Sequence, residues 1–421
     1  MADRPRYDKN IFLQPESSHH STVVMIPESF SQSDIDLDIS TPVRITHIFS
    51  SYPGNIYPDS ALENLMLKTK LEGFKLMIMR KMEPNLLWDD PLITSRNIFE
   101  VIHTCVEKTG FPIKDLVLYV GNNSVNKSYD MWCGLHRIPK RNRLTVRDSH
   151  FWMRGVNNTY TEVNCYTGLQ NKIRSKYFTC FNGRMRYQKK DIARHFYNTG
   201  YLNTHKKDKA YLSFVFDNTE QDDPFYQANP GLWEALPRSI EENKPYHPHS
   251  KDWDSLRVEI MATDEFSRVQ QDSYFDLTVE FVQNEDWWWP DYTTARKNWP
   301  WWFEHCCSEK VIRNVKNRRP FIIIGEPFLL DYMAQHYNFK SFDFLFDESY
   351  DKITDYTTRY RNVLHQVTSL CERLSLQELH DIIYSPQMED VLEHNYEMLK
   401  QFGPIYDKKE TQELLDLMQS K

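Results

Sequence analysis

The chain has 421 residues, of which 40% are hydrophobic and 26% charged, as is typical of a globular protein long enough for two domains. Its formal net charge of −8 disfavours a general nucleic-acid binder, and seven cysteines without Cys-x-x-Cys spacing predict neither a disulfide framework nor a zinc site. Because no apolar run approaches the ~20 residues of a membrane span and the first residues do not resemble a signal peptide, we expect a cytoplasmic protein without a membrane span.

The N-terminal part of the sequence predicts an irregular lead-in followed by an α/β domain. Residues 1–40 are polar and contain many turn-forming residues, which favour irregular structure. Residues 41–170 contain apolar stretches that predict strands at 43–49, 74–79 and 116–120. Between the last two strands, residues 95–108 place apolar side chains on one helical stripe: Ile98, Phe99, Ile102 and Cys105. Alternation of strands and helices indicates a parallel sheet in a Rossmann-like domain.

Residues 171–354 predict a second α/β domain. Within it, 176–202 predicts a strand, a tight turn and a helix that stops at Gly200. Further strands are predicted at 210–216, 274–282 and 321–324, and further helices at 308–316 and 327–336. Residues 217–254 are rich in proline, asparagine and charge, which predicts a long loop or lid. Residues 355–421 predict a C-terminal helical segment with breaks at Ser385-Pro386 and Gly403-Pro404.

The predicted fold class is therefore α/β, with two facing Rossmann-like domains and C-terminal helices. Ligands of open α/β sheets bind beyond the carboxyl ends of the strands, against helix N-termini. The polar triplet Ser308-Glu309-Lys310 lies at such a predicted helix start, ahead of the apolar strand 321–324. We therefore consider this triplet a candidate binding site.

Each residue of the triplet suits one part of a nucleotide-sugar. Ser308 is a favourable N-cap, and the free N–H groups and dipole of a helix start attract anions. Lys310 adds a positive charge for a pyrophosphate, and Glu309 can accept hydrogen bonds from a ribose diol. The alternative is that Glu309 and Lys310 merely decorate a helix start, where a glutamate is favourable in any case.

Two further stretches have an unusual composition. Residues 136–209 contain 17 Lys and Arg against 4 Asp and Glu, so they form either a solvated face or a surface that meets phosphates. Residues 287–302 contain six Trp, which form either a sugar-stacking platform or a clamp that holds this insert on its domain.

Several motifs resemble a family of glycosyltransferases carried by tailed phages and large DNA viruses. After the triplet come "PFIIIG" (320–325), "NFKSF" (338–342) and "DESYD" (347–351), with Arg359 beyond. Upstream, "FNGRMR" (181–186) resembles the Asn-Arg signature of this family, although the later His-Arg of that signature is absent. The resemblance covers residues 177–365 and implies a viral protein, active in the host cytoplasm.

The triplet followed by a strand is also similar to the donor-binding part of α1,3-fucosyltransferases, which have the GT-B fold. Carried over by position, this resemblance implies that Glu309 meets the ribose of the donor. It implies that Lys310, Arg184 and Arg186 meet the pyrophosphate of a GDP- or UDP-linked sugar, with no metal or other cofactor. The N-terminal domain would then bind the acceptor, a glycan or another hydroxyl compound.

The catalytic base is not identified by these patterns. Glu280, a carboxylate inside an apolar strand, is one candidate, and its alternative is a side chain turned to solvent. His305, directly ahead of the triplet, is a second candidate, and its alternative is a packed histidine. A metal-dependent transferase would need an Asp-x-Asp sequence, which 34–36, 36–38 and 252–254 match by letters only.

Two other functions stay open at this point. One is a non-catalytic viral protein on a glycosyltransferase-like scaffold, because a fold does not guarantee an activity. The other is a nucleic-acid-binding module that uses the basic residues 136–209, although the net charge makes a nucleic-acid partner less favourable.

Overall fold

The computed structural model describes most of the second half of the chain and parts of the first. The described residues are 12–13, 22–23, 47–50, 59–72, 76–80, 98–120, 125–148, 162–184, 187–215, 224–235, 264–280 and 307–419. The chain divides into two compact units. The first comprises Met1–Arg154, Glu304–Cys306 and Pro404–Lys421, and the second Gly155–Phe303 and Cys307–Gly403. Among the described helices, none combines the length and the apolar character needed to cross a membrane.

The first unit contains a mainly parallel sheet. Its described strands are β1 (Phe12–Leu13), β2 (Thr22–Val23), β3 (His47–Ser50), β4 (Leu76–Arg80), β5 (Leu116–Val120) and β6 (Thr145–Asp148), in the order β1-β2-β3-β4-β5-β6. Strands β3 to β6 pair in parallel, whereas β1 and β2 join by antiparallel pairing. Strands β3, β4 and β5 correspond to the three predicted strands, and β1 and β2 fall within the predicted lead-in.

The helices of the first unit follow the predicted alternation. They are α1 (Asp59–Glu72), α2 (Ile98–Thr109) and α3 (Val125–Leu135), with short 3-10 turns η1 (Ile113–Asp115) and η2 (Lys140–Asn142). On α2, three of the four residues of the predicted apolar stripe are fully inaccessible to solvent, namely Phe99, Ile102 and Cys105, and the Ile98 side chain lies outside the described residues. The Phe99 ring packs edge-on against Tyr129 of α3, with ring centroids 4.9 Å apart.

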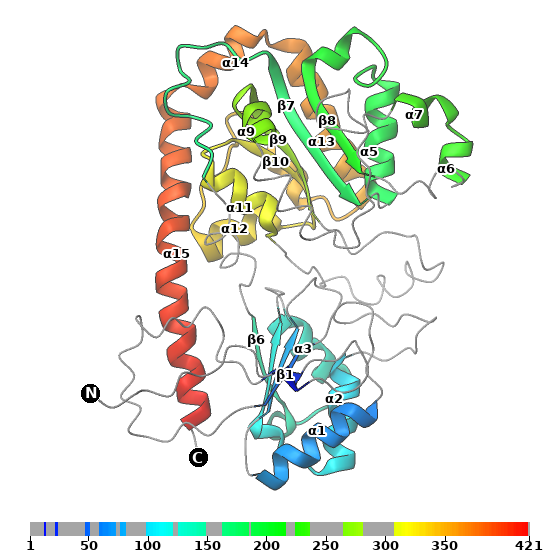
Figure 1. Cartoon of the computed structure of the whole chain (residues 1–421), viewed down its shortest axis with the longest axis vertical. Helices are drawn as coiled ribbons and strands as arrows, with labels where there is room; N and C mark the ends of the chain where they lie inside the picture. Colours follow the sequence, from blue (N-terminus) through cyan, green and yellow to red (C-terminus); the bar gives the residue numbers. More distant parts are fainter. Residues whose placement is uncertain are drawn as a thin grey trace. The chain divides into compact units, whose positions relative to one another are not determined.

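The second unit contains a parallel sheet with the order β10-β9-β7-β8 (Figure 1). Its described strands are β7 (Lys176–Arg184), β8 (Ala210–Val215), β9 (Ser273–Val279) and β10 (Phe321–Ile324). Every residue of β9 and β10 is buried, as expected for parallel strands that are covered on both faces. The predicted fold class, an α/β protein with two Rossmann-like domains, is confirmed.

Helices connect successive strands of this second sheet: α5 (Tyr187–Asn198), α9 (Asp264–Gln271) and α11 (Glu309–Lys316), with the shorter α6 (Pro224–Gln227), α7 (Pro230–Ala235) and η3 (His205–Lys209). After the last strand, β10, come α12 (Leu329–Tyr337) and the short η5 (Glu348–Lys352). The predicted stop of α5 is confirmed, since Gly200 adopts φ +89° and a Cβ there would lie 2.7 Å from Thr204 Oγ1. Short helices α6 and α7 fall in the predicted loop 217–254, of which 217–223 and 236–254 lie outside the described residues.

The C-terminal segment is helical, as predicted, but one predicted break is wrong. The helices are α13 (Tyr356–Arg373), α14 (Leu376–Ile383) and α15 (Pro386–Gln419). The break at Ser385-Pro386 is confirmed, whereas α15 runs through Gly403-Pro404. An interior proline costs a helix about 3 kcal/mol. Burial of Met388, Leu392 and Leu399 on α15 anchors the helix before the proline and outweighs this local preference.

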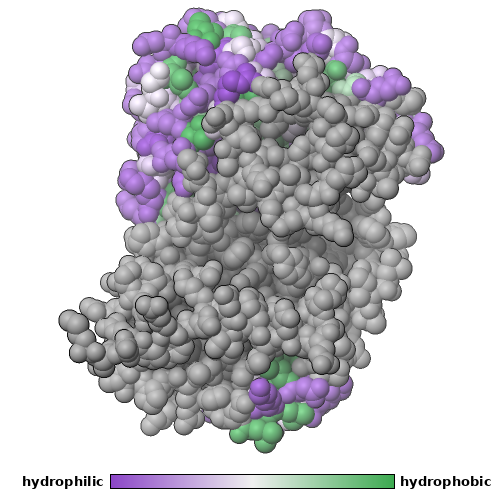
Figure 2. Space-filling model, in the orientation of Figure 1, coloured by the Kyte–Doolittle hydropathy of each residue, from purple (hydrophilic) through white to green (hydrophobic). Residues whose placement is uncertain are grey.

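The described surface of the second unit is mainly hydrophilic on the face drawn in Figure 2. On the first unit, α1 exposes two leucines one helical turn apart, Leu67 at 43% and Leu71 at 88%. Exposed leucines of this kind are common on globular proteins and carry no functional argument alone.

Candidate functional site

The Ser308-Glu309-Lys310 triplet lies where the carboxyl end of β9 meets the start of α11. The β9–β10 ladder pairs Val279 with Ile324 and continues by one residue, because the Glu280 backbone N–H donates to the Ile324 carbonyl (2.8 Å). Glu280 is 1% exposed, so the alternative of a solvent-facing Glu280 is wrong. The candidate site therefore has a buried carboxylate at its base.

Ser308 is the N-cap of α11, as the sequence predicts. Its backbone is extended, and its Oγ accepts a hydrogen bond from the Lys310 N–H (3.3 Å). Ser308 also donates to one oxygen of Glu280 twice, from its backbone N–H (3.0 Å) and from its hydroxyl (2.8 Å). The Glu280 carboxylate thus fixes the start of α11 against the end of β9, at the positive end of the helix dipole.

The Lys310 side chain folds back onto the same carboxylate. Its Nζ lies 3.3 Å from the other Glu280 oxygen and 3.1 Å from the Ser308 hydroxyl oxygen. The side chain is 15% exposed. A cation in the first turn of a helix opposes the helix dipole, and a largely buried one also loses hydration. This position of Lys310 does not favour folding, and the negative charge of Glu280 has to compensate its positive charge.

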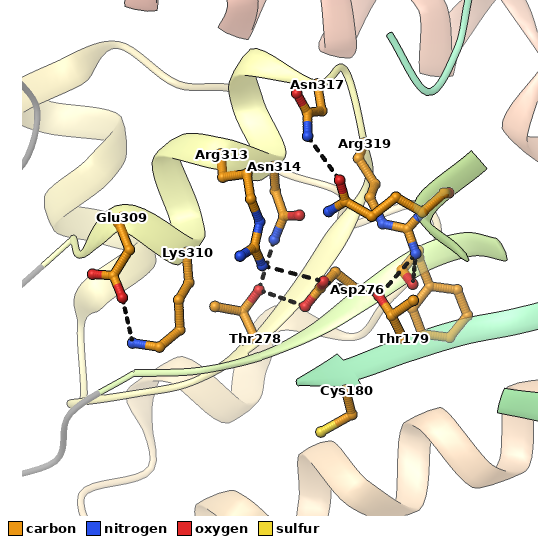
Figure 3. Close-up of polar contacts among 12 residues, drawn as sticks. Thr179, Cys180, Asp276, Thr278, Glu309, Lys310, Arg313, Asn314, Asn317 and Arg319 are labelled. Atoms are coloured by element: carbon orange, nitrogen blue, oxygen red, sulfur yellow. Dashed lines mark hydrogen bonds and ion pairs between the residues drawn. The ribbon is translucent and has the colours of Figure 1, made fainter. Parts of the chain in front are cut away.

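Glu309 and Cys307 complete the surroundings of the triplet. Glu309 is 4% exposed, and one of its oxygens lies 3.8 Å from Lys310 Nζ (Figure 3). Glu309 and Lys310 are both largely buried, and the alternative that they serve only the helix start stays open. Cys307 is 3% exposed, and burial together with the charge of Glu280 raises the pKa of its thiol well above its usual value. This cysteine is therefore a protonated, inert neighbour.

The rest of the interface between α11 and β9 is polar too. Because side chains alternate along a strand, Asp276 and Thr278 lie on the same face as Glu280. An Arg313 guanidinium nitrogen lies 3.8 Å from Asp276, and Asn314 Nδ2 donates to Thr278 Oγ1 (2.8 Å), as Figure 3 shows. We call the following six residues the polar ladder: Asp276, Thr278 and Glu280 on the strand side, and Lys310, Arg313 and Asn314 on the helix side.

Arg319 extends the polar ladder toward the amino end of the sheet. This residue is fully buried, and burial lowers its pKa to about 10. Its guanidinium donates to the Ser273 and Phe275 carbonyls (2.7 Å each) and to the Thr179 hydroxyl (2.9 Å). Thr179 in turn donates to Asp276 (2.9 Å), which joins the ladder to the neighbouring strand β7.

Not all the residues predicted for the site can be placed. Arg184 is the last residue of β7, the strand next to β9, so its backbone lies at the same carboxyl edge of the sheet. The Arg184 side chain lies outside the described residues. Arg186 and His305 lie outside them as whole residues. The Asp-x-Asp sequences and the Trp-rich stretch 287–302 lie outside them as well. The structure brings together four predicted site residues: Glu280, Ser308, Glu309 and Lys310.

The Asp347–Asp351 motif stabilises the fold beside this site. The Asp351 carboxylate accepts hydrogen bonds from the first backbone N–H groups of α12: Leu329 (3.0 Å), Leu330 (3.1 Å) and Asp331 (3.4 Å). Burial raises the pKa of Asp351 to about 6, and these hydrogen bonds oppose that shift. The motif therefore caps a helix with an internal anion.

Arg359, the residue beyond this motif, holds the end of β10. It is 1% exposed and donates to the carbonyls of Gly325 (2.9 Å) and Ile353 (2.7 Å). The motif residue Tyr350 is buried as well, and its hydroxyl accepts from the Ile323 N–H (3.3 Å). Both contacts fix the strand end next to Glu280, and neither side chain is available to a ligand.

Several positive charges of the basic region 136–209 do not lie on the surface. Arg174 and Lys190 are each 1% exposed. Lys206 forms an ion pair with Glu372 (2.6 Å). Other basic residues of this region are exposed, among them Arg137, Lys140 and Arg141, so the alternative of a nucleic-acid-binding module stays open.

The sequence contains signals for the polar ladder that our predictions did not use. In "SYFDLTVEFV", polar residues occupy every second position from Asp276 to Glu280, which places them on one face of a strand. In the following helix, Lys310, Arg313 and Asn314 have the i, i+3, i+4 spacing of one helical stripe. A further carboxylate, Glu326, directly follows Gly325 beyond β10 and is 3% exposed.

Comparisons with known proteins give distant likenesses. No model of a protein family matches the chain, and no curated protein matches it. Among solved structures, the chain is similar to one described as trehalose-6-phosphate from E. coli bound with UDP-2-fluoro glucose, with 11% identity and a TM-score of 0.40 over 89% of this chain and 73% of that chain. It is also similar to a GtfA/B complex, with 7% identity and a TM-score of 0.36 over 88% of this chain and 63% of that chain. Likenesses this distant carry no argument for a function.

Proposed function

We propose that the chain is a GT-B-type glycosyltransferase that binds a nucleotide-sugar donor at the carboxyl edge of the sheet β10-β9-β7-β8. The observation that carries this proposal is the Lys310 ammonium, largely buried at the positive end of α11 and balanced by Glu280. A diphosphate offers Lys310 further anionic oxygens and meets the positive end of the helix dipole. An arrangement that does not favour folding is thus useful for binding an anion.

The other residues of the triplet take roles that fit their chemistry. Glu309 would accept hydrogen bonds from the ribose hydroxyls beside the diphosphate. Arg184 and Arg186 would provide further positive charge from the end of the neighbouring strand β7, as the motif resemblance of 177–365 implies. The acceptor, a glycan or another hydroxyl compound, would bind to the N-terminal domain.

The transfer step would need charge stabilisation more than covalent help from the protein. The bond between the anomeric carbon and the phosphate oxygen breaks while the acceptor oxygen bonds to that carbon, and the diphosphate leaves with its negative charge. Lys310 and the start of α11 would stabilise this charge without a metal ion. The acceptor proton goes to a base, for which His305 stays a candidate. Both Glu280 oxygens already bind Ser308 and Lys310, so Glu280 suits the support of Lys310 better than proton transfer.

A nucleotide screen tests the proposal directly. We expect one of GDP, UDP or CDP, or one of their sugar conjugates, to raise the Tm of the protein. A ligand at about 100 times its Kd adds about 2.7 kcal/mol to the free energy of unfolding. Lys310→Met and Glu309→Gln should each reduce this ligand-induced rise at nearly constant side-chain volume, because methionine removes the positive charge and glutamine leaves only one neutral acceptor oxygen for the ribose.

The matched control is Lys316→Met, at the other end of the same helix. Lys316 lies in the last turn of α11, away from the candidate site, so the variant should keep the full response to the nucleotide. Binding without sugar transfer or donor hydrolysis would support the non-catalytic alternative. No stabilisation by any nucleotide, in a protein that unfolds cooperatively, would contradict the proposal.

A further inference from the structure

The helix that holds the candidate site buries apolar residues such as Ile312, and it also makes several buried polar contacts with strand β9. Asp276 and Thr278 are each 2% exposed, and Arg313 and Asn314 are 5% and 0% exposed. Apolar packing is non-directional and tolerates small shifts of a helix along a strand. Buried hydrogen bonds and ion pairs tolerate such shifts much less, because a misplaced partner leaves a buried polar group unsatisfied.

The contacts of the polar ladder fix the position of α11 along β9. Lys310 pairs with Glu280 at the carboxyl end of β9, and one helical turn later Arg313 and Asn314 pair with Asp276 and Thr278, which lie nearer its amino end. A slide of α11 by one strand residue, about 3.3 Å, would break all three contacts together. The start of α11 is therefore held at one place relative to the carboxyl edge.

We infer that Thr278 and Asn314 are positioning residues for the anion site at the start of α11, an inference that rests on the proposed function. Neither residue belongs to the triplet, and Thr278 lies about 7 Å along the strand from Glu280. Their contact of 2.8 Å sets where Ser308 and Lys310 lie against Glu280. Supporting contacts of this kind decide how well a binding group is aimed.

The double variant Thr278→Val/Asn314→Leu tests this inference. It removes the contact that positions α11 along β9, while it should change the free energy of unfolding little. Valine and leucine approximate the shapes of threonine and asparagine, and replacing both partners of a buried hydrogen bond by apolar groups is nearly neutral for stability. The variant also removes the hydrogen bond from the Thr278 hydroxyl to Asp276 (3.1 Å), whereas the Asp276–Arg313 pair and the triplet are left in place. We expect a Tm lowered by no more than the loss of that one hydrogen bond, with affinity for the nucleoside diphosphates UDP or GDP lower by about tenfold.

A second readout does not depend on any ligand. The Ser308 N–H donates to Glu280, so its hydrogen exchange reports whether the start of α11 stays against the end of β9. We expect faster exchange of the Ser308 and Lys310 amides in the double variant than in the wild type, both measured without nucleotide. If the wild type binds no nucleoside diphosphate, the proposed function fails, and this exchange measurement still decides the positioning role.

The matched control is Ile312→Val on the same helix. Ile312 is fully buried but belongs to no contact of the ladder, so the variant should lower the Tm while it keeps the nucleotide affinity and the exchange of Ser308. A double variant with a lower Tm but unchanged affinity and unchanged Ser308 exchange would overturn the inference, since Thr278 and Asn314 would then be structural residues alone.

Discussion

Helices α2 and α11 each bury one face in an α/β unit, but they bury different kinds of side chain. The buried stripe of α2 contains Phe99 and Ile102, whereas α11 buries Arg313 and Asn314 in addition to apolar residues such as Ile312. An apolar stripe stabilises a fold and accepts many sequences, while a polar stripe gives little net stability and accepts few. The polar contacts of α11 therefore specify the position of its first turn, where the candidate site lies.

The largest expected effect comes from breaking the ion pair under the site. Asp276→Asn leaves Arg313 buried without its carboxylate partner, which typically costs 3–5 kcal/mol, here about 4 kcal/mol of the free energy of unfolding. Denaturant unfolding of the purified variant measures this loss. Asp208→Asn is the matched control, since Asp208 is 78% exposed beside Lys176 and its removal should cost less than about 1 kcal/mol. Equal losses in the two variants would contradict the distinction.

Truncation of the apolar stripe should have a slightly smaller effect with a different cause. Ile102→Ala leaves a cavity beside Phe99 on α2 and should cost about 3 kcal/mol. Hydrogen exchange of α2 peptides, which reports on the first unit separately, measures this loss. Because the cavity lies in the first unit, the amides of Ser308 and Lys310 should keep their exchange rates. Faster exchange at those amides would show that the two helices are not independent.

The smallest predicted effect depends on pH and concerns His103, a half-buried histidine of α2. Burial and the neighbouring His136 lower the pKa of His103 to about 4, below the usual value of 6.5. A group with a lowered folded-state pKa of this kind contributes its full stability above pH 6.5 and loses it as the pH falls toward 4. We expect His103→Gln to remove about 2 kcal/mol of this pH dependence.

Urea unfolding of the wild type and of His103→Gln at several pH values between 7 and 4 would measure the effect. Glutamine can keep the contact with the Tyr129 hydroxyl, which lies 2.9 Å from His103 Nε2. The free energy of unfolding of the two proteins should therefore converge or cross as the pH falls. Parallel curves would show that His103 does not titrate differently in the folded state.

Much of the architecture could be predicted from local patterns. The runs at 116–120 and 321–324 match β5 and β10 residue for residue, because short apolar runs bounded by turn residues have few alternatives. The N-cap of α11 was equally predictable from Ser308. The break at Gly403-Pro404 failed because packing along α15 outweighs the preference of two residues.

Part of the site could be predicted from the sequence, and there is a physical reason why the rest could not. The triplet marks a helix start, but the contact of Lys310 with Glu280 joins residues thirty positions apart in the chain and depends on which strand face meets which helix stripe. The roles of Asp276 and Arg313 depend on the same pairing. Pairing across a helix–sheet interface is a tertiary property, which a single sequence does not specify by spacing alone.

The cap of α12 by Asp351 also bears on how small ions compete with a ligand. Sulfate and inorganic phosphate bind wherever a helix start leaves its amides open. At α12 the chain's own carboxylate already takes the first three amides, so buffer anions find no vacancy there. Added phosphate would then compete with a nucleotide at the start of α11 and leave α12 unaffected.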